Sequence, residues 1–452
     1  MDACSKTGDA RGGLNRRDFL KVSGAGLAGA SLLGVAGCGG GGGPERNEAG
    51  AIEVVFSTSP YATGALDEII GRFNEEHRGE INVTRRDAPT DTSASFQQRL
   101  TEFQAGGGDV DVIGGDVIWA AQFAANDWIA DLSDRFTEDM RADFLEGPVE
   151  SNTYDGAVYG VPWFTDAGML YYRRDLLQKS GYDNPPETWD ELVEMAKQVR
   201  RDSGLDLGFV FQGANSESGV VNGLEYINSY GGSVIAPDDP ERITVDSPDA
   251  AEGLGAERGM VEEGVSPQSV ANFTEEESEA SFLNGDAVFC RNWPYMYALT
   301  SDEETSSITP DQVGVAPLPR GSQGESASGL GGANFYINAF SDQETQEAAW
   351  EFVRYATERE QQRIFALDAS LLPTRSALYD DQEILDEVPV IDLAGEALER
   401  TVPRPVSPYY SDMSLEMAEE FNASLTGDKT PEAAISTLQQ SLQGIVEEGS
   451  QS

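Results

Sequence analysis

Apolar and polar positions follow two alternating periods over the first folded part of the chain. Residues 52–56 form a run rich in β-branched side chains, which is typical of a strand, and residues 64–77 have apolar side chains at helical spacing. These helical positions are Leu66, Ile69, Ile70 and Phe73. Residues 81–87, 95–107 and 109–116 then predict a strand, a helix and a strand. Because strands alternate with helices, the pattern favours a parallel α/β sheet.

The alternation resumes after an interruption. Residues 156–177 are a long β-rich run, and 185–201 predict a helix that begins after Thr188. Its buried face is expected at Trp189, Leu192, Val193 and Ala196. A further strand is expected to end at Cys290. We interpret the chain as two α/β lobes that share connections, with a ligand cleft between them.

Length and charge narrow the possible functions. At 452 residues the chain is long for one core, which agrees with two lobes. Acidic residues outnumber basic ones by 79 to 30, and the net charge is −49. The acids are scattered rather than collected in one tail, which indicates a solvated acidic coat of the kind suited to very high salt. Nucleic-acid binding needs a basic footprint, and the sequence contains no basic cluster.

Cysteine and histidine are too few for several kinds of site. Three cysteines, two of them near the N-terminus, cannot form a disulfide framework. The single His77 cannot build a metal centre with them, so we expect neither a metal nor a cofactor.

The N-terminal segment has the order of an export signal. Arg16 and Arg17 match the twin-arginine pattern, and residues 22–36 form a short, mildly apolar run. Cys38 follows Val-Ala-Gly, which resembles a lipid-acceptor motif. We therefore predict a lipoprotein signal peptide over 1–37 and a glycine-rich tether over 38–50, although a chance Gly/Ala-rich leader is the alternative.

Several segments together resemble a known family. They are "DVDVIGGDVIWAAQFAANDWIADLS", "YGVPWFTDAGMLYYRRDLL" with "PPETWDELVEMAKQV", "FLNGDAVFCRNWPY", "GGANFYINAFS", "LLPTRSALYDD" and "VPRPVSPYYSDMS". In order and spacing, residues 51–448 resemble the extracellular solute-binding proteins of ABC importers, in the carbohydrate-binding branch that includes maltose- and trehalose-binding proteins. The resemblance implies a two-lobed periplasmic-binding-protein fold (type II, maltose-binding-like), with hinge strands and an interlobe ligand cleft.

The family fold also implies where the chain passes between lobes. By analogy the crossings lie near Pro162–Asp166, near Gly331–Phe335 and around residues 380–390. Lobe 1 would then combine 51–163 with 335–380. Lobe 2 would combine 164–334 with 381–452.

Trp293 and Tyr295 are the first candidates for ligand contact. They follow the strand that ends at Cys290, and Pro294 stiffens the loop between them. This places both rings at the C-terminal edge of a strand, where open α/β sheets bind ligands. In the resembled family a tryptophan and a tyrosine here stack on the sugar, whereas ordinary packing of half-buried rings is the alternative.

The resemblance supplies the remaining candidates. Asp116 and Asp166 match acidic ligand residues, although each could simply cap a helix or turn. Gly331 and Gly332 match a glycine pair that approaches the ligand, and a plain hinge would need the same residues. Arg404 matches a bidentate arginine, with a surface ion pair as the alternative.

Weaker candidates and two departures from the family pattern complete the site. Tyr61 and Tyr409 are candidate contacts, with Tyr410 beside the latter. Phe164 stands where relatives carry a tyrosine, and Ala333 stands where relatives can carry a tryptophan. These departures leave the identity of the sugar open.

The resulting functional hypothesis is a binding protein rather than an enzyme. It would capture a di- or oligosaccharide of the maltose or trehalose type and deliver it to the transmembrane subunits of an ABC permease. We expect a monomer on the extracellular face of the cytoplasmic membrane, attached only through a lipid on Cys38. Alternatives are the same fold with another solute, such as a polyamine, and a secreted glycosidase that uses a carboxylate pair.

Overall fold

The computed structural model describes residues 43–60, 64–236, 239–322 and 324–449. One compact unit begins at Gly43. The predictions for Arg16, Arg17, Cys38 and Tyr61 lie outside the described residues. The last part of the predicted tether already belongs to the folded unit, because the Arg46 side chain pairs with Glu344.

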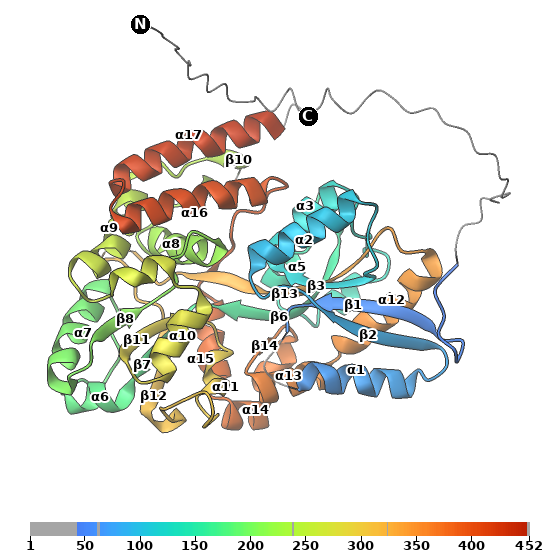
Figure 1. The fold of residues 1–452 in the computed structure, drawn as a ribbon, viewed down its shortest axis with the longest axis horizontal. Coiled ribbons are helices and arrows are strands. Elements are labelled where there is room, and N and C mark those ends of the chain that lie inside the picture. The colour runs from blue at the N-terminus through green and yellow to red at the C-terminus, as the bar shows by residue number, and fades with distance from the viewer. Residues whose placement is uncertain (1–42, 61–63, 237–238, 323, 450–452) are drawn as a thin grey trace, which may run out of the picture. The chain divides into compact units, whose positions relative to one another are not determined.

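The larger sheet contains most of the strands predicted near the N-terminus (Figure 1). Its strand order is β14-β6-β13-β3-β1-β2, and β15 pairs with β13. The bounds are β1 Ile52–Thr58, β2 Ile81–Asp87, β3 Val112–Asp116, β6 Gly160–Ala167, β13 Ser328–Ile337, β14 Leu372–Pro373 and β15 Thr401–Val402. As the alternation predicts, β1 is parallel to β2 and β3, whereas β13 runs antiparallel to β3 and β6.

Helices cover both faces of this sheet because successive side chains of a strand point to opposite faces. Val112 and Phe335 belong to the apolar cluster under α1, α12 and α13, and Ile113 and Tyr336 to the cluster under α2 and α3. The helix bounds in this lobe are α1 Ala65–Glu76, α2 Thr92–Gln104, η2 Val117–Trp119, α3 Ala120–Ala125, α4 Glu138–Arg141, α5 Glu146–Glu150, α12 Gln343–Ala356 and α13 Arg359–Ala369. The predicted inner face of α1 is buried.

The second sheet has the order β12-β7-β11-β8. Its bounds are β7 Met169–Arg173, β8 Leu207–Val210, β11 Ala287–Asn292 and β12 Val313–Pro317. Its helices are α6 Arg174–Lys179, α7 Trp189–Ser203, α8 Glu217–Ser229, α9 Pro248–Glu262, α10 Glu275–Leu283, α11 Met296–Leu299, α14 Gln382–Glu387, α15 Val390–Leu398, α16 Tyr410–Thr426 and α17 Pro431–Gly449. Short elements are β4 Thr153–Tyr154, β5 Ala157–Val158, β9 Ile235–Ala236, β10 Asp239–Ile243, η3 Gln268–Asn272, η4 Pro310–Gln312 and η5 Ser376–Asp380.

Helix α7 begins where its cap predicts. The Thr188 hydroxyl accepts the Glu191 N–H at 3.2 Å, and Gly204 ends the helix with a φ of 78°. Trp189, Leu192 and Ala196 are buried as expected. Val199 completes the buried face, while Val193 is only partly covered.

Two strands join the sheets. Gly168 alone separates β6 of the larger sheet from β7 of the smaller one, and β13 pairs with β6 alongside (Figure 1). The expected crossings at 162–166 and 331–335 fall within these two strands. Farther along, α14 packs on α13, and α15 packs against β12 of the smaller sheet. The exact division of the chain between lobes stays a prediction.

Glu257 on α9 is a buried acid that should make stability depend on pH. Burial, with a smaller contribution from the Glu225 carboxylate, raises the pKa of Glu257 from 4.5 to about 8. Between these values the folded chain binds more protons than the unfolded chain, so the free energy of unfolding falls as pH rises. We expect Glu257→Gln to be more stable than the parent at pH 8.5 by at least about 2 kcal/mol.

Urea unfolding of both proteins at pH 5 and pH 8.5 measures this difference. The gain from Glu257→Gln should shrink at pH 5, where the parent carboxyl is protonated. An equal gain at both pH values would contradict a raised pKa of Glu257.

Candidate functional site

Three predicted site residues from the two sheets meet beside the connecting strands. Gly331 on β13 lies opposite Asp166 on β6. A Cβ added to Gly331 would lie 2.9 Å from Cζ3 of Trp293 and 3.1 Å from Cβ of Asp166. Trp293 follows β11 directly, so the end of a lobe 2 strand meets the paired connections at this point. Asp166 is 127 positions from Trp293 and 165 positions from Gly331 in the sequence, so the fold brings together three residues that lie far apart along the chain.

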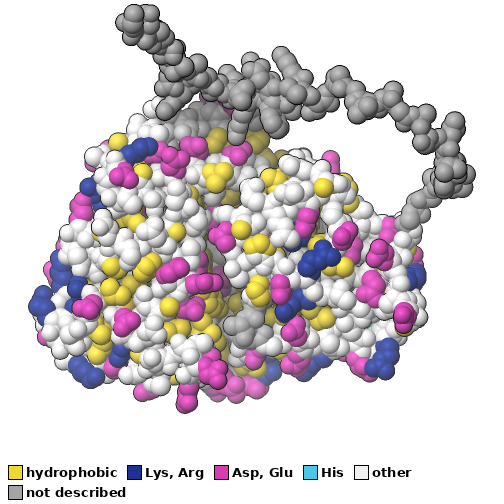
Figure 2. All heavy atoms as spheres, in the orientation of Figure 1, with side chains coloured by type: hydrophobic (Ala, Val, Ile, Leu, Met, Phe, Trp, Pro, Cys, Tyr) yellow, Lys and Arg dark blue, Asp and Glu magenta, His cyan; other side chains and the backbone are white. Residues whose placement is uncertain are grey.

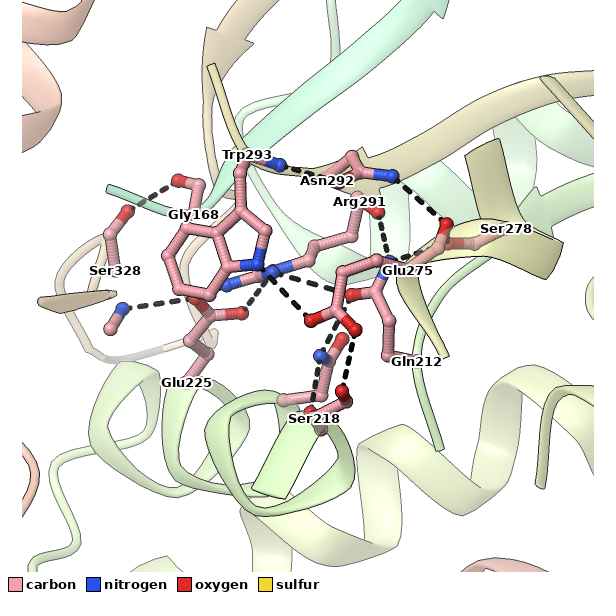
Figure 3. Close-up of polar contacts among 12 residues, drawn as sticks. Gly168, Gln212, Ser218, Glu225, Glu275, Ser278, Arg291, Asn292, Trp293 and Ser328 are labelled. Carbon is pink, nitrogen blue, oxygen red and sulfur yellow. Dashed lines mark hydrogen bonds and ion pairs between the residues drawn. The ribbon is translucent and has the colours of Figure 1, made fainter. Parts of the chain in front are cut away.

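The Trp293 indole is half-buried and fixed along its edge and on one face. Its Nε1 donates to Oε1 of Glu275 at 3.2 Å, and Cζ of Arg291 lies 4.0 Å from the ring centroid. Figure 3 shows the guanidinium group on one side of the indole. A ring held in this way can offer its other face to a flat apolar group with little loss of side-chain entropy.

Tyr295 lies at the junction of the two lobes. It is half-buried and packs on apolar clusters of both the larger and the smaller sheet. Burial raises the pKa of Tyr295, and the nearby carboxylates Glu279 and Glu275 raise it further. The ring is therefore part of the packing between lobes, as the packing alternative for Tyr295 predicts, while its position in the sequence two residues after Trp293 keeps it next to the candidate site.

Asp166 is a buried carboxyl whose hydrogen bonds are incomplete. It is 8% exposed, and its Oδ1 has no hydrogen-bond partner within the described part of the chain. Desolvation raises the pKa of Asp166 well above its usual range, although Arg291 opposes this shift. A buried carboxyl oxygen without a partner is costly, so Asp166 is ready to bond to a polar group of a ligand.

Asp116 and Arg404 form an ion pair that extends to a third residue. Nη2 of Arg404 lies 2.6 Å from Oδ1 of Asp116, and Nη1 lies 2.8 Å from Oε1 of Glu217. Burial alone would lower the pKa of Arg404, but the two carboxylates raise it. Asp116 ends β3, Glu217 begins α8, and Arg404 follows β15. The triad therefore links the larger sheet to lobe 2, and Asp116 also caps η2 through the Ile118 N–H.

The tyrosine pair at the start of α16 divides between two roles. Tyr409 packs on Gly449 of α17, where an added Cβ would lie 2.3 Å from its ring. The next residue, Tyr410, is buried and donates to Oε1 of Glu217 at 2.7 Å. Thus Tyr410 reaches the Asp116 triad, and Tyr409 faces the C-terminal helix.

Gly332 and Phe164 are constrained by the close approach of the two connecting strands. Gly332 has a φ of 116°, and a Cβ there would lie 2.4 Å from the carbonyl oxygen of Phe164. The Phe164 ring is buried against Trp163, with ring centroids 5.3 Å apart. The close approach of the two strands is by itself enough to require a glycine at position 332. Phe164 lies in the core of the larger sheet.

Gly332→Ala should destabilise the protein strongly. The left-handed backbone and the contact with a carbonyl oxygen together should cost about 2 kcal/mol or more of the free energy of unfolding. Gly331→Ala is the matched control, because Gly331 does not have a positive φ and its added Cβ would meet side-chain atoms of Trp293 and Asp166 rather than a backbone carbonyl oxygen. Thermal unfolding should show the larger loss for Gly332→Ala, and equal losses would contradict the proposed role of the backbone at Gly332.

Sequence reasoning missed Glu217, Glu225, Glu275 and Arg291. The three glutamates are hidden among 79 acidic residues, most of which are solvated. Arg291 did carry a signal, because it interrupts the apolar strand "AVFCRN", and a buried arginine needs a buried partner.

Cys290 beside it is a buried free thiol, as expected, and burial raises its pKa.

Hollows occur both between the lobes and on the outside of lobe 2. A cavity of about 40 Å³ lies between lobe 1, at Phe96 and Trp119, and lobe 2, at Glu217 and Leu415. A groove of about 780 Å³ lies among α7, α9 and α17, away from Trp293. Figure 2 shows a furrow between the two halves on one face, with acidic side chains scattered around it.

Metal sites and membrane-spanning helices can both be assessed for the described residues. Within that part of the chain, His, Cys, Asp and Glu form no group of three or more that could hold a metal ion. None of the helices there combines the length and apolarity needed to cross a membrane.

Fold and site together define the class of this protein. Two α/β lobes joined by paired strands, with an aromatic face and polar groups at their junction, are the architecture of a two-lobed solute-binding protein. Residues 59–363 match the family of bacterial extracellular solute-binding proteins. The chain belongs to this family.

Individual relatives agree with this assignment. A probable ABC transporter-binding protein of Deinococcus radiodurans is 37% identical over 360 residues, which cover 78% of this chain and 83% of the relative. The maltose-bound MalE3 of T. maritima superposes with a TM-score of 0.81 at 37% identity, covering 87% of this chain and 99% of that one. The predicted two-lobed, maltose-binding-like fold is confirmed, and these relatives are binding proteins rather than enzymes.

Proposed function

We propose that the protein is the extracellular binding component of an ABC importer and captures a neutral di- or oligosaccharide of the maltose or trehalose type. The observation that carries the proposal is the placement of the fixed Trp293 indole against Gly331 and Asp166 at the lobe junction. Sugars present apolar C–H faces and a rim of hydroxyls, which suit an aromatic face beside a carboxyl group. The similarity to a maltose-bound relative at 37% identity supports the same ligand class.

The charge state of the site favours a neutral ligand over a polyamine. Arg404 pairs with the Asp116 carboxylate, with Nη2 2.6 Å from Oδ1, so this carboxylate is not free to bind a cationic ligand. The pKa of Asp166 is raised by desolvation, which favours its uncharged form. A polyamine site would need exposed, ionised carboxylates to offset the ligand's charge.

The proposed mechanism is closure of the two lobes on the sugar. The ligand would contact groups on both sheets and thereby favour the closed state by its differential affinity for that state. The closed form would then dock on the transmembrane subunits of the permease, which cytoplasmic ATPases drive. The protein would work as a monomer.

The leader and the charge suggest where this capture takes place. The twin-arginine pattern at Arg16 and Arg17 and the acceptor motif at Cys38 support export in the folded state and attachment to the outer face of the membrane by a lipid. The net charge of −49 supports work in high salt, where repulsion between acids is screened over a few ångströms.

A calorimetric and tryptophan-fluorescence screen in molar salt tests the proposal. We expect maltose, trehalose or a longer glucoside to bind, and spermidine not to bind. Incubation with the bound sugar should release no glucose. Binding of spermidine without any sugar would overturn the ligand class, and release of glucose would overturn the binding-only function.

A further inference from the structure

Glu225 and Arg291 form the most completely buried ion pair of lobe 2 among the described residues. Their side chains are 2% and 1% exposed. Nε of Arg291 donates to Oε2 of Glu225 at 2.8 Å, and Nη2 donates to Oε1, so the pair is bidentate (Figure 3). Gln212 accepts from the remaining Nη1 at 3.3 Å. Glu225 comes from α8 and Arg291 from β11, so both partners belong to lobe 2.

The same pair touches both strands that connect the lobes. Oε1 of Glu225 accepts the backbone N–H of Gly329 on β13 at 2.9 Å. At Gly168, between β6 and β7, an added Cβ would lie 2.1 Å from Oε1 of Glu225 and 2.5 Å from Nη2 of Arg291. The two connections are also tied to each other, because the Ser328 hydroxyl donates to the Gly168 carbonyl at 2.8 Å. A change of backbone angle at Gly168 or Gly329 would therefore act directly on this pair.

The other end of the pair supports the Trp293 indole. The guanidinium Cζ of Arg291 lies 4.0 Å from the ring centroid, on the face that Figure 3 shows against the arginine. A planar guanidinium can stack on a ring and bind a carboxylate with two parallel hydrogen bonds, whereas an ammonium group cannot do both. Arg291 thus fixes the tilt of the indole, and Glu225 fixes the position of the Arg291 guanidinium group.

We propose that Glu225 and Arg291 are positioning residues that couple the Trp293 face to the two interlobe connections, so that stacking of a sugar and closure of the lobes occur together. The proposal rests on the proposed function for its ligand. Stability alone is a weak reason for the pair, because apolar residues of similar volume are often as stabilising as a buried ion pair. Direct contact with Gly168, Gly329 and Trp293 is the feature that a merely stabilising pair would not need.

Glu225→Gln tests the coupling with a matched control in the same lobe. The amide keeps the volume of the side chain but removes the charge that orients Arg291. The control is Asp175→Asn, which breaks the bidentate pair of Arg173 and Asp175, with distances of 2.9 Å for both hydrogen bonds, far from Trp293. A double variant, Glu225→Leu with Arg291→Met, replaces the pair by apolar groups. It tests the coupling if the single variant does not fold.

Two measurements without ligand come first, on the full chain in molar salt. Small-angle scattering gives the radius of gyration, and the emission of Trp293 is isolated by subtracting the Trp293→Phe spectrum. We expect Glu225→Gln and the double variant to show a larger radius of gyration and a shifted Trp293 emission. Asp175→Asn should leave both at the parent values, even if its melting temperature falls as much.

The sugar found by the screen, with maltose as first probe, then gives the third measurement. Glu225→Gln should raise the dissociation constant about ten-fold, which corresponds to 1.4 kcal/mol of coupling. If the variants keep the parent radius, emission and affinity, or if Asp175→Asn changes them equally, the coupling is overturned. If the parent protein binds no sugar, the proposed function fails, while the two ligand-free measurements still decide the coupling.

Discussion

Arg404→Ala should lower the free energy of unfolding by about 3–5 kcal/mol, the largest loss of stability expected from a single substitution here. The guanidinium of Arg404 is 4% exposed and lies between Asp116 and Glu217, which are 18% and 7% exposed. Removing it leaves the Glu217 carboxylate buried without its positive partner, supported by the hydroxyls of Tyr410 and Ser414. Desolvation of that charge, rather than the lost attraction, accounts for the size of the effect.

Equilibrium unfolding in urea measures the loss, and Glu217→Gln combined with Arg404→Met provides the control. The double variant removes both charges and should recover most of the stability. Arg354→Met is a second control, because Arg354 pairs with Glu351 and Glu358 and all three side chains are 42–43% exposed, so its loss should cost far less. A loss below about 1 kcal/mol for Arg404→Ala would mean that the triad is hydrated in solution.

Trp293→Ala should weaken sugar binding by about 1–3 kcal/mol, or roughly 5- to 150-fold in the dissociation constant. The indole is fixed by Glu275 and Arg291 before any ligand arrives, so stacking of a sugar on the ring would carry little ordering cost. Trp293→Phe should lose less, because a ring face remains while the hydrogen bond to Glu275 is lost.

Trp350→Ala is the matched control for this loss. Trp350 is also partly buried against a core, but it lies on α12 in lobe 1 and outside the candidate site. Isothermal titration calorimetry of the three variants compares them directly. If Trp293→Ala binds the sugar as tightly as the parent does, then Trp293 is a packing residue and the stacking site lies elsewhere.

Much of the local structure could be predicted because it depends on periodicity and caps. The inner face of α1 and the Thr188 start of α7 follow from near neighbours in the sequence, and the parallel direction of β1, β2 and β3 follows from the alternation of strands with helices. The Trp293 candidate also came from local order, since a strand followed by aromatic residues places rings at a sheet edge. That Gly331 and Asp166 belong to the same ligand site was expected only from the family resemblance, and their contact with Trp293 was not predicted.

The partners of buried charges could not be predicted from periodicity. Glu225 and Arg291 are 66 residues apart, and Asp116 and Arg404 are 288 apart. In a chain with 79 acidic residues, a buried glutamate has the same sequence appearance as a solvated one. Only the tertiary fold, in which Glu225 of α8 meets Arg291 of β11 and Asp116 at the end of β3 meets Arg404 after β15, selects these pairs.

By itself the sequence determined the α/β alternation, the acidic composition, the scarcity of histidine and cysteine and the aromatic segment after β11, because these depend on composition and on local spacing. The tertiary structure decided that Tyr410 rather than Tyr409 reaches the Glu217 carboxylate and that Tyr295 packs between the lobes. It also decided that Arg291 supports the indole. The physical reason is desolvation: a charge or a ring acquires its role from the groups that exclude water around it, and those groups come from distant parts of the chain.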